Sequence, residues 1–373
     1  MSFEDDLGFL KKHGDVIVLT SPSGGKVIVS PKYQGRVMTS AVEASGRSLG
    51  FVFRKFIESG KTGTQFDNYG GEDRFWLGPE AGQFGLYFPK GKPFTISEWK
   101  TPDAFQTGTW EPTSSDAQKV VFKRPMKIEN YAGATFDLEV TRTVALLDDK
   151  AVATKLGVTP SASVKWVGFE TTNRVENTGT NTWNKDTGLL SVWILGMYNP
   201  SPDTRVVIPF EKGQGDIVND KYFGKVPADR LKIDEKLGVV LFKCDGQQRG
   251  KIGIGPKRSK SVAGSYSASA KLLTIVDYDF PKRGNYVNSM WEQQKDPYAG
   301  DVVNSYNDGP TEPGKPSLGG FYEIESSSPA LALKPKVAIA HAHRTYHFIG
   351  EPADLDPIAK KVLGVTIAEI TAP

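Results

Sequence analysis

The stretch Tyr69–Gln83, YGGEDRFWLGPEAGQ, combines more kinds of functional side chain than any other part of the chain. Gly70 and Gly71 permit a positive φ and a close approach of neighbouring backbone. Phe75–Leu77 is an apolar run that is too short for a helix and typical of a buried strand, which the following Gly-Pro ends. The stretch therefore predicts a tight turn that leads into a buried strand.

The charged and aromatic residues around this strand fit a site for a polyol. Carboxylate and guanidinium groups hydrogen-bond hydroxyl groups, and an aromatic ring covers the C–H face of a sugar. A rigid turn with a salt bridge and two core aromatics uses the same residue types, so both interpretations stay open. The candidate ligand-binding residues here are Glu72, Asp73, Arg74, Trp76 and Glu80.

The rest of the chain indicates an all-β protein with a short helix at each end. Gly (39) and Pro (24) are frequent, and short apolar stretches such as Lys26–Ser30, Arg36–Val42 and Phe51–Phe56 are divided by turn residues. Links this short join antiparallel strands. Helical patterns are confined to residues 1–14, where Ser2 is a candidate N-cap, and to residues 351–373, where Asp356 is expected to cap, Pro357 to occupy N1 and Gly364 to end the helix.

Composition excludes several classes of protein. The 46 basic and 43 acidic residues nearly balance and form no long basic run, so no nucleic-acid partner is expected. No window of about 18 apolar residues exists, so no membrane span is expected. Cys244 is the only cysteine, which excludes an intrachain disulfide and a cysteine metal cluster. The first residues lack the apolar core of a signal peptide, so we expect a cytoplasmic protein, or a periplasmic or extracytoplasmic one if a leader is missing from this chain.

A second dense stretch, residues 285–310, is rich in amides, acids and aromatics. A surface loop needs no such mixture, so the stretch indicates the lining of a site. A long loop that satisfies its own hydrogen bonds is the alternative. The candidate residues are Asn288, Trp291, Asn307 and Asp308.

Two late strands carry titratable residues on one face each. The two-residue period places Glu323 and Glu325 together in the strand at residues 321–325, and His341, His343 and His347 together in the strand at residues 337–348. Three histidines could bind a metal, act as acid/base groups beside Glu325, or form a polar face paired across strands. The expected site includes no metal and no other cofactor.

Arg142 lies within an apolar strand, LEVTRTVAL. A buried charge needs a partner, and we expect a structural ion pair here rather than contact with a ligand.

Four motifs together resemble an uncharacterised bacterial family of the galactose-mutarotase-like superfamily. They are GGEDRFWLGPE, NTG…W…LLSVWILGM, YVNSMWEQQ…PYAGDVVNSYNDGP and FYEIESSSPALALKP…HAHRTYHF. The resemblance runs from about Val16 to Phe348. It implies one domain over residues 1–373, a β-supersandwich of large, twisted antiparallel sheets with a ligand cleft.

The resemblance also implies a carbohydrate ligand. Aldose epimerases of this superfamily use a glutamate base near the C-terminus, for which Glu325 is the first candidate and Glu323 the second, and histidine acids earlier in the chain. GGEDRFW and LLSVWILGM hold no histidine, so Glu72, Asp73, Glu80 or a late histidine would have to be the acid. The expected catalytic residues are Glu325, Glu323, His341 and His343.

Several functions are compatible with these residues. The first is a protein that binds or processes a mono- or oligosaccharide, with epimerase-type acid/base chemistry at Glu325. A glycan-binding module without catalysis is the second, and a glycoside hydrolase with two carboxylates about 5–10 Å apart is the third. A metal-dependent enzyme is the fourth.

Overall fold

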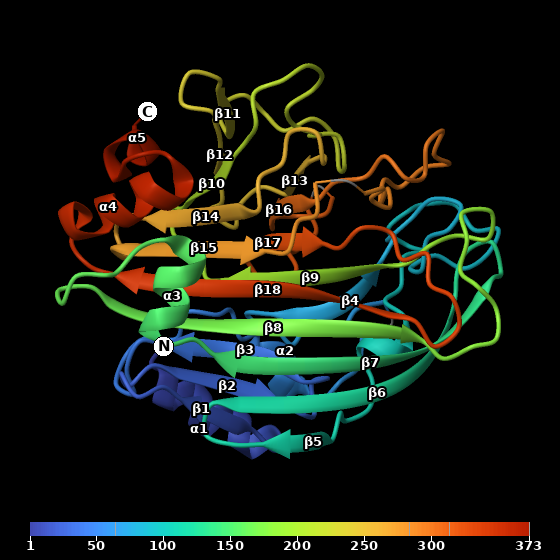
Figure 1. The fold of residues 1–373 in the computed structure, drawn as a ribbon, viewed down its shortest axis with the longest axis horizontal. Coiled ribbons are helices and arrows are strands. Elements are labelled where there is room, and N and C mark those ends of the chain that lie inside the picture. Colours follow the sequence, from blue (N-terminus) through green and yellow to red (C-terminus); the bar gives the residue numbers. More distant parts are fainter. Residues whose placement is uncertain (64, 283, 313, 373) are drawn as a thin grey trace.

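Antiparallel strands form three sheets in the computed structural model, which describes residues 1–63, 65–282, 284–312 and 314–372 (Figure 1). The ten-stranded sheet has the order β11 (Leu231–Asp234), β12 (Val239–Lys243), β10 (Arg205–Pro209), β14 (Val262–Ser267), β15 (Leu272–Tyr278), β18 (Ala338–Ile349), β8 (Lys165–Asn177), β7 (Thr135–Leu146), β6 (Lys119–Glu129) and β5 (Pro112–Ser115). The five-stranded sheet has the order β13 (Gly250–Ile254), β16 (Val303–Asn307), β17 (Tyr322–Ser327), β9 (Ser191–Tyr198) and β4 (Arg74–Gly78). The third sheet consists of β1 (Ile17–Thr20), β2 (Lys26–Ser30) and β3 (Arg36–Ala41). The predicted all-β fold is confirmed.

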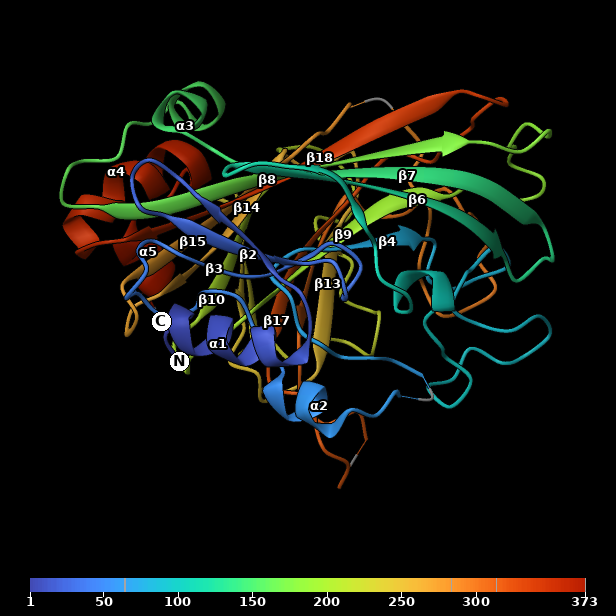
Figure 2. The same cartoon turned by 90° about the horizontal axis from the view of Figure 1, so that it is seen from below.

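The ten-stranded and five-stranded sheets pack face to face (Figure 2). One apolar cluster between them takes side chains from both sheets, because residues two apart in a strand point to the same side. We call the face of each sheet that meets this cluster its inner face. Members of the cluster include Val206, Phe242 and Val276 of the larger sheet and Ile252, Val303 and Ile324 of the smaller one.

The helices cover the outside of the sheets. Helix α1 (Phe3–His13) begins with a capping box in which Ser2 and Asp5 bond each other's backbone N–H, as expected for Ser2 as N-cap. Helices α3 (Asp149–Leu156), α4 (Pro352–Leu363) and α5 (Ile367–Thr371) lie at one end of the molecule, and their apolar residues pack on the outer face of the ten-stranded sheet (Figure 2). Within the described ranges no helix is long and apolar enough to cross a membrane.

Helix α4 begins earlier than the sequence predicts. Glu351 is its N-cap and Pro352 occupies N1, where the missing N–H costs no hydrogen bond, so the predicted start at Asp356 and Pro357 is wrong. The Asp356 carboxylate instead accepts a hydrogen bond from the backbone of Ile367, at the start of α5. The predicted end is confirmed, because Gly364 adopts the left-handed conformation.

The predicted strand at Phe51–Phe56 is also wrong in its second half. Only isolated bridges form here, at Gly50 and Val52. The chain then enters α2 (Arg54–Ser59), and Arg54 forms an ion pair with Asp6 of α1. This contact between helices replaces the continued strand pairing.

The predicted tight turn before β4 is confirmed. Gly70 has a φ of 81° and Gly71 a φ of 117°. A Cβ on Gly70 would lie 2.2 Å from the carbonyl oxygen of Phe51, so a side chain at this position would collide with backbone.

A fully buried ion pair joins the two large sheets. Arg142 of β7 contacts Asp73, which immediately precedes β4, at 2.6 Å, and neither side chain is exposed. Asn173 of β8 accepts a second hydrogen bond from the guanidinium, and Thr171 donates to the other Asp73 oxygen. The structural partner predicted for Arg142 is thus found, and it fixes the start of β4 against the larger sheet.

This network leads to a first prediction. Arg142→Met leaves the Asp73 carboxylate buried without its partner, so we expect the free energy of unfolding to fall by about 3–5 kcal/mol. Urea unfolding measures the change. Lys165→Met, which removes an exposed ion pair with Glu43, is the matched control and is expected to cost less than about 1 kcal/mol. Equal losses in the two variants would contradict the structural role of Arg142.

Candidate functional site

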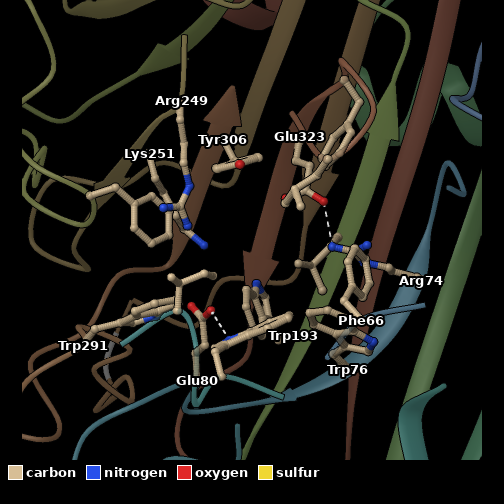
Figure 3. Close-up of a pocket in the computed structure, with 16 residues that line it drawn as sticks. Phe66, Arg74, Trp76, Glu80, Trp193, Arg249, Lys251, Trp291, Tyr306 and Glu323 are labelled. Atoms are coloured by element: carbon tan, nitrogen blue, oxygen red, sulfur yellow. Dashed lines mark hydrogen bonds and ion pairs between the residues drawn. The ribbon is translucent and has the colours of Figure 1, made fainter. Parts of the chain in front are cut away.

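A cavity lies on the outer face of the five-stranded sheet, the face turned away from the larger sheet (Figure 3). Strand alternation decides which residues reach it: Glu323 of β17 faces the cavity, whereas Tyr322 and Ile324 face the core between the sheets. Its floor combines residues from all five strands or their ends: Arg74, Trp76, Trp193, Leu195, Arg249, Lys251, Tyr306 and Glu323.

Loops between the strands form the walls. The volume of the cavity, measured as the space that the centre of a water molecule can occupy, is about 80 Å³. One water needs about 10–15 Å³ by this measure, so the cavity has room for roughly six waters, comparable to one sugar ring. The wall residues are Phe66, Glu80, Ile96, Trp99, Phe223, Trp291, Leu318 and Phe321.

Each cation of the cavity lies over an aromatic ring. The Arg74 guanidinium is 4.2 Å from the centre of the Trp76 ring. The Lys251 ammonium is 4.9 Å from the Trp193 ring. The Arg249 guanidinium is 3.7 Å from the Phe223 ring. Cation–π attraction therefore helps to hold all three charges at the surface of a cavity that is rich in aromatic rings.

Glu323 is a cavity carboxyl whose pKa is raised to near neutrality. Burial raises its pKa from 4.5 to about 7; the Arg74 guanidinium opposes this effect and the nearby Glu325 carboxylate adds to it. Arg74 contacts Glu323 at 2.7 Å across β9. A carboxyl group with such a pKa can both give and take a proton at pH 7.

Glu325 lies in the same row of β17 but is fully buried. The Trp193 indole N–H donates to one of its oxygens at 2.8 Å, and the Lys251 ammonium contacts the same oxygen at 2.9 Å. Burial lowers the pKa of Lys251, but the charges of Glu325 and Glu80 outweigh this effect and raise it, so Lys251 is cationic. Glu325 thereby anchors Lys251 in the floor.

Glu80 lies on the other side of the cavity from Glu323 (Figure 3). The Trp99 indole N–H donates to its carboxylate at 3.0 Å, and its backbone N–H donates to Ser289. Burial raises the pKa of Glu80, while Lys251 opposes the rise. The cavity thus holds two titratable carboxyl groups, Glu80 and Glu323, on separate walls.

Other predicted site residues lie between the sheets instead. Asp73 is held by Arg142, and Glu72 contacts His347 at 2.6 Å. His341 and His343 share the hydroxyl of Ser326, and their side chains are buried on the inner face. Burial lowers the pKa of His341 and of His343 to about 3, so both are neutral at pH 7.

The late histidines thus form the polar face paired across strands that the sequence left open. Two of the three, His341 and His343, meet at one serine, whereas His347 bonds Glu72 and Thr274. Among the residues that the structure describes, no group of three His, Cys, Asp or Glu side chains could hold a metal ion.

Three residues of the second dense stretch organise loops rather than line the cavity. Asn288 bonds the backbone of Asp296. Asn307 accepts from the Gly246 N–H, and Asp308 accepts from the Gly320 N–H. Trp291 from the same stretch does line the cavity. The stretch therefore contributes one residue to the lining of the cavity, while three others hydrogen-bond loop backbone, so each of the two interpretations applies to part of it.

Sequence reasoning missed several cavity residues, among them Trp99, Trp193, Phe223, Arg249 and Lys251. Lys251 gave a usable signal, because a lysine in a short apolar strand needs a buried partner. Trp193 lay within a continuous apolar run, where nothing in the pattern distinguished the cavity face from the core face.

The large antiparallel sheets, packed face to face, define an all-β sandwich. The chain matches the family of unknown function DUF6786 over residues 1–373 and belongs to that family. No curated protein is similar enough to count as a relative.

Solved structures share the fold at low sequence identity. The putative aldose 1-epimerase of Escherichia coli K12 has a TM-score of 0.51 and 12% identity over 89% of this chain and 98% of that chain. The Slr1438 protein of Synechocystis sp. PCC 6803 has a TM-score of 0.51 and 12% identity over 90% of this chain and 96% of that chain. At such identities the likeness shows the fold alone.

The raised pKa of Glu323 leads to a second prediction. Because its folded pKa of about 7 exceeds the ordinary 4.5, the folded protein binds this proton more tightly than the unfolded chain does. Its contribution to stability is therefore complete below about pH 4.5 and is lost as the pH rises to about 7. Relative to Glu323→Gln, which cannot titrate, the wild type should lose stability over this range in urea unfolding.

Glu139→Gln is the matched control for this titration. Glu139 forms an exposed pair with Lys123, so its replacement should leave the pH dependence of the wild type almost unchanged. Parallel stability curves for the wild type and Glu323→Gln would show that the pKa of Glu323 is not raised.

Proposed function

We propose that this protein binds a carbohydrate in the cavity and exchanges its anomers by acid/base chemistry, with Glu323 and Glu80 as the proton-transferring groups. The observation that carries the proposal is the Glu323 carboxyl, which has a pKa of about 7 in an aromatic cavity of the size of one sugar ring. Tryptophan faces would cover the C–H face of the sugar, and the charged groups would bond its hydroxyls.

The chemistry requires a base and an acid on different sides of the sugar. Ionised Glu323 takes the proton of the anomeric hydroxyl, the bond between the anomeric carbon and the ring oxygen breaks, and protonated Glu80 gives its proton to the ring oxygen. The open-chain aldehyde rotates about the bond next to the carbonyl, and the reverse steps close the ring to the other anomer. Raised pKa values of both carboxyls suit these roles.

In this mechanism Glu325 is a positioning residue. It holds Lys251, whose charge in turn opposes the rise in the pKa of Glu80. The sequence favoured Glu325 as the base, and this assignment remains the alternative, because one of its oxygens has no hydrogen-bond partner among the described residues.

A glycan-binding module without catalysis is the second candidate function. It is favoured by the ion pair between Arg74 and Glu323, which occupies the proposed base, and by the absence of histidine from the residues that line the cavity. Such a module would use the same rings and charges for binding alone.

The third prediction separates these functions. With glucose, galactose and the corresponding uronic acids, we expect two NMR signals. Saturation transfer from the protein to the sugar reports binding, and anomer exchange faster than in buffer alone reports catalysis. Glu323→Gln should slow the exchange by about 10²–10⁴-fold while it keeps saturation transfer, because it removes the base and leaves the rings. Glu139→Gln on the outer surface should match the wild type.

Other outcomes assign the function differently. Saturation transfer without exchange in the wild type would support the glycan-binding module. Exchange that survives Glu323→Gln but is lost in Glu325→Gln would make Glu325 the base. Neither signal with any sugar would reject the proposed carbohydrate site.

A further inference from the structure

Arg249 differs from the other two cations of the cavity. Arg74 is paired with Glu323 at 2.7 Å, and Lys251 is paired with Glu325 at 2.9 Å. No carboxylate in the described part of the chain lies within ion-pair distance of the Arg249 guanidinium, and its Nε is buried without a hydrogen-bond partner. A half-buried guanidinium without an acid is costly unless an anion joins it.

The position of Arg249 is fixed without a carboxylate. Its guanidinium stacks on the Phe223 ring at 3.7 Å and lies 6.0 Å from the Trp291 ring. A planar guanidinium held in this way keeps N–H groups directed at the cavity, and such a fork suits the two oxygens of a carboxylate or a phosphate. The ring contact also reduces the entropy lost when an anion binds.

Arg249 lies at the boundary between two hollows. With Phe223 it lines both the cavity and a second hollow, whose other walls include Gln247, Thr311 and Glu312. In the cavity its guanidinium lies on a different side from Glu323 (Figure 3). A ligand whose anomeric centre lies near Glu323 would therefore direct another substituent towards Arg249.

The charges of the cavity favour an anion over a cation. Among the charged residues that line the cavity, three are cations and two are carboxyl groups, and burial raises the pKa of both carboxyls, so positive charge is in excess. One face each of the Trp76, Trp193 and Phe223 rings is already covered by a cation of the protein. An amino sugar would meet repulsion where an acidic sugar meets attraction.

We infer that the ligand is an acidic sugar whose carboxylate or phosphate binds Arg249. This inference rests on the proposed carbohydrate site and adds its substrate class. The two anions share the chemistry of bidentate binding to a guanidinium, and they differ in size and charge, so direct comparison of a hexuronate with a hexose phosphate distinguishes them.

The fourth prediction measures the preference for an acidic ligand. Calorimetric titration of the purified protein with glucuronate, glucose 6-phosphate and glucose should give an affinity for at least one acidic sugar about 10-fold or more above that for glucose. In Arg249→Met the ratio of acidic to neutral affinity should fall to about 1. Arg249→Lys keeps the charge but not the fork, so an intermediate ratio is expected.

Arg174→Met is the matched control. Arg174 forms a partly exposed pair with Glu176 on β8, away from the cavity, so its replacement should keep the wild-type ratio. Thermal unfolding of all variants shows that each is folded at the temperature of the titration. The readout is the ratio of acidic-sugar affinity to glucose affinity within one variant. A variant that binds all sugars more weakly would keep this ratio, so it would not be mistaken for one that has lost the preference for acidic sugars.

Each outcome bears on a different claim. Equal affinity for acidic and neutral sugars in the wild type, or an unchanged preference in Arg249→Met, would overturn the acidic-sugar inference and leave the carbohydrate site intact. Failure of every sugar to bind would overturn both. Preference for glucose 6-phosphate over glucuronate would assign the anion as phosphate, and the reverse would assign it as carboxylate.

Discussion

The buried ion pair between Asp73 and Arg142 is the interaction on which the position of the cavity depends. It ties the start of β4 to β7 of the larger sheet, so that the next residue, Arg74, must point the other way. Arg74 then reaches across β9 to Glu323. Two neighbouring residues of opposite charge thus point to opposite faces of the sheet. Asp73 holds the two sheets together, and Arg74 pairs with the Glu323 carboxylate in the cavity. A shift of one residue in β4 would exchange these roles and put an acid where the cavity has a cation.

Within the cavity, burial and pairing act against each other. Burial alone favours the neutral form of the acids and of Lys251. Pairing with Lys251 and a hydrogen bond from Trp193 hold Glu325 in the floor, whereas the pKa of Glu323 remains raised although Arg74 opposes the rise. Two glutamates of one strand therefore differ in their surroundings, and the difference follows from their partners rather than from their residue type.

Sequence patterns predicted the fold more fully than the site. The two-residue period placed Glu323 and Glu325 on one face of β17 and the late histidines on one face of β18, and the structure confirms both placements. The period could not tell which face meets the cavity, because both faces of the five-stranded sheet are buried. Glu72, Asp73, His341 and His343 were therefore candidates although they lie between the sheets. Phe223 comes from a long polar segment with weak periodicity, and Arg249 lies just before a short strand. Only the folded chain brings them to Glu323.

Tryptophan is concentrated around the cavity to an unusual degree. Four of the seven tryptophans of the chain line it, and Trp76, Trp99 and Trp193 form ring contacts with one another or with Tyr87. Indole emission depends on the polarity around the ring and on nearby proton donors. Four of the seven indoles therefore surround the space that a ligand would fill, and the aromatic lining that gives the cavity its shape would also act as an optical reporter of its occupancy.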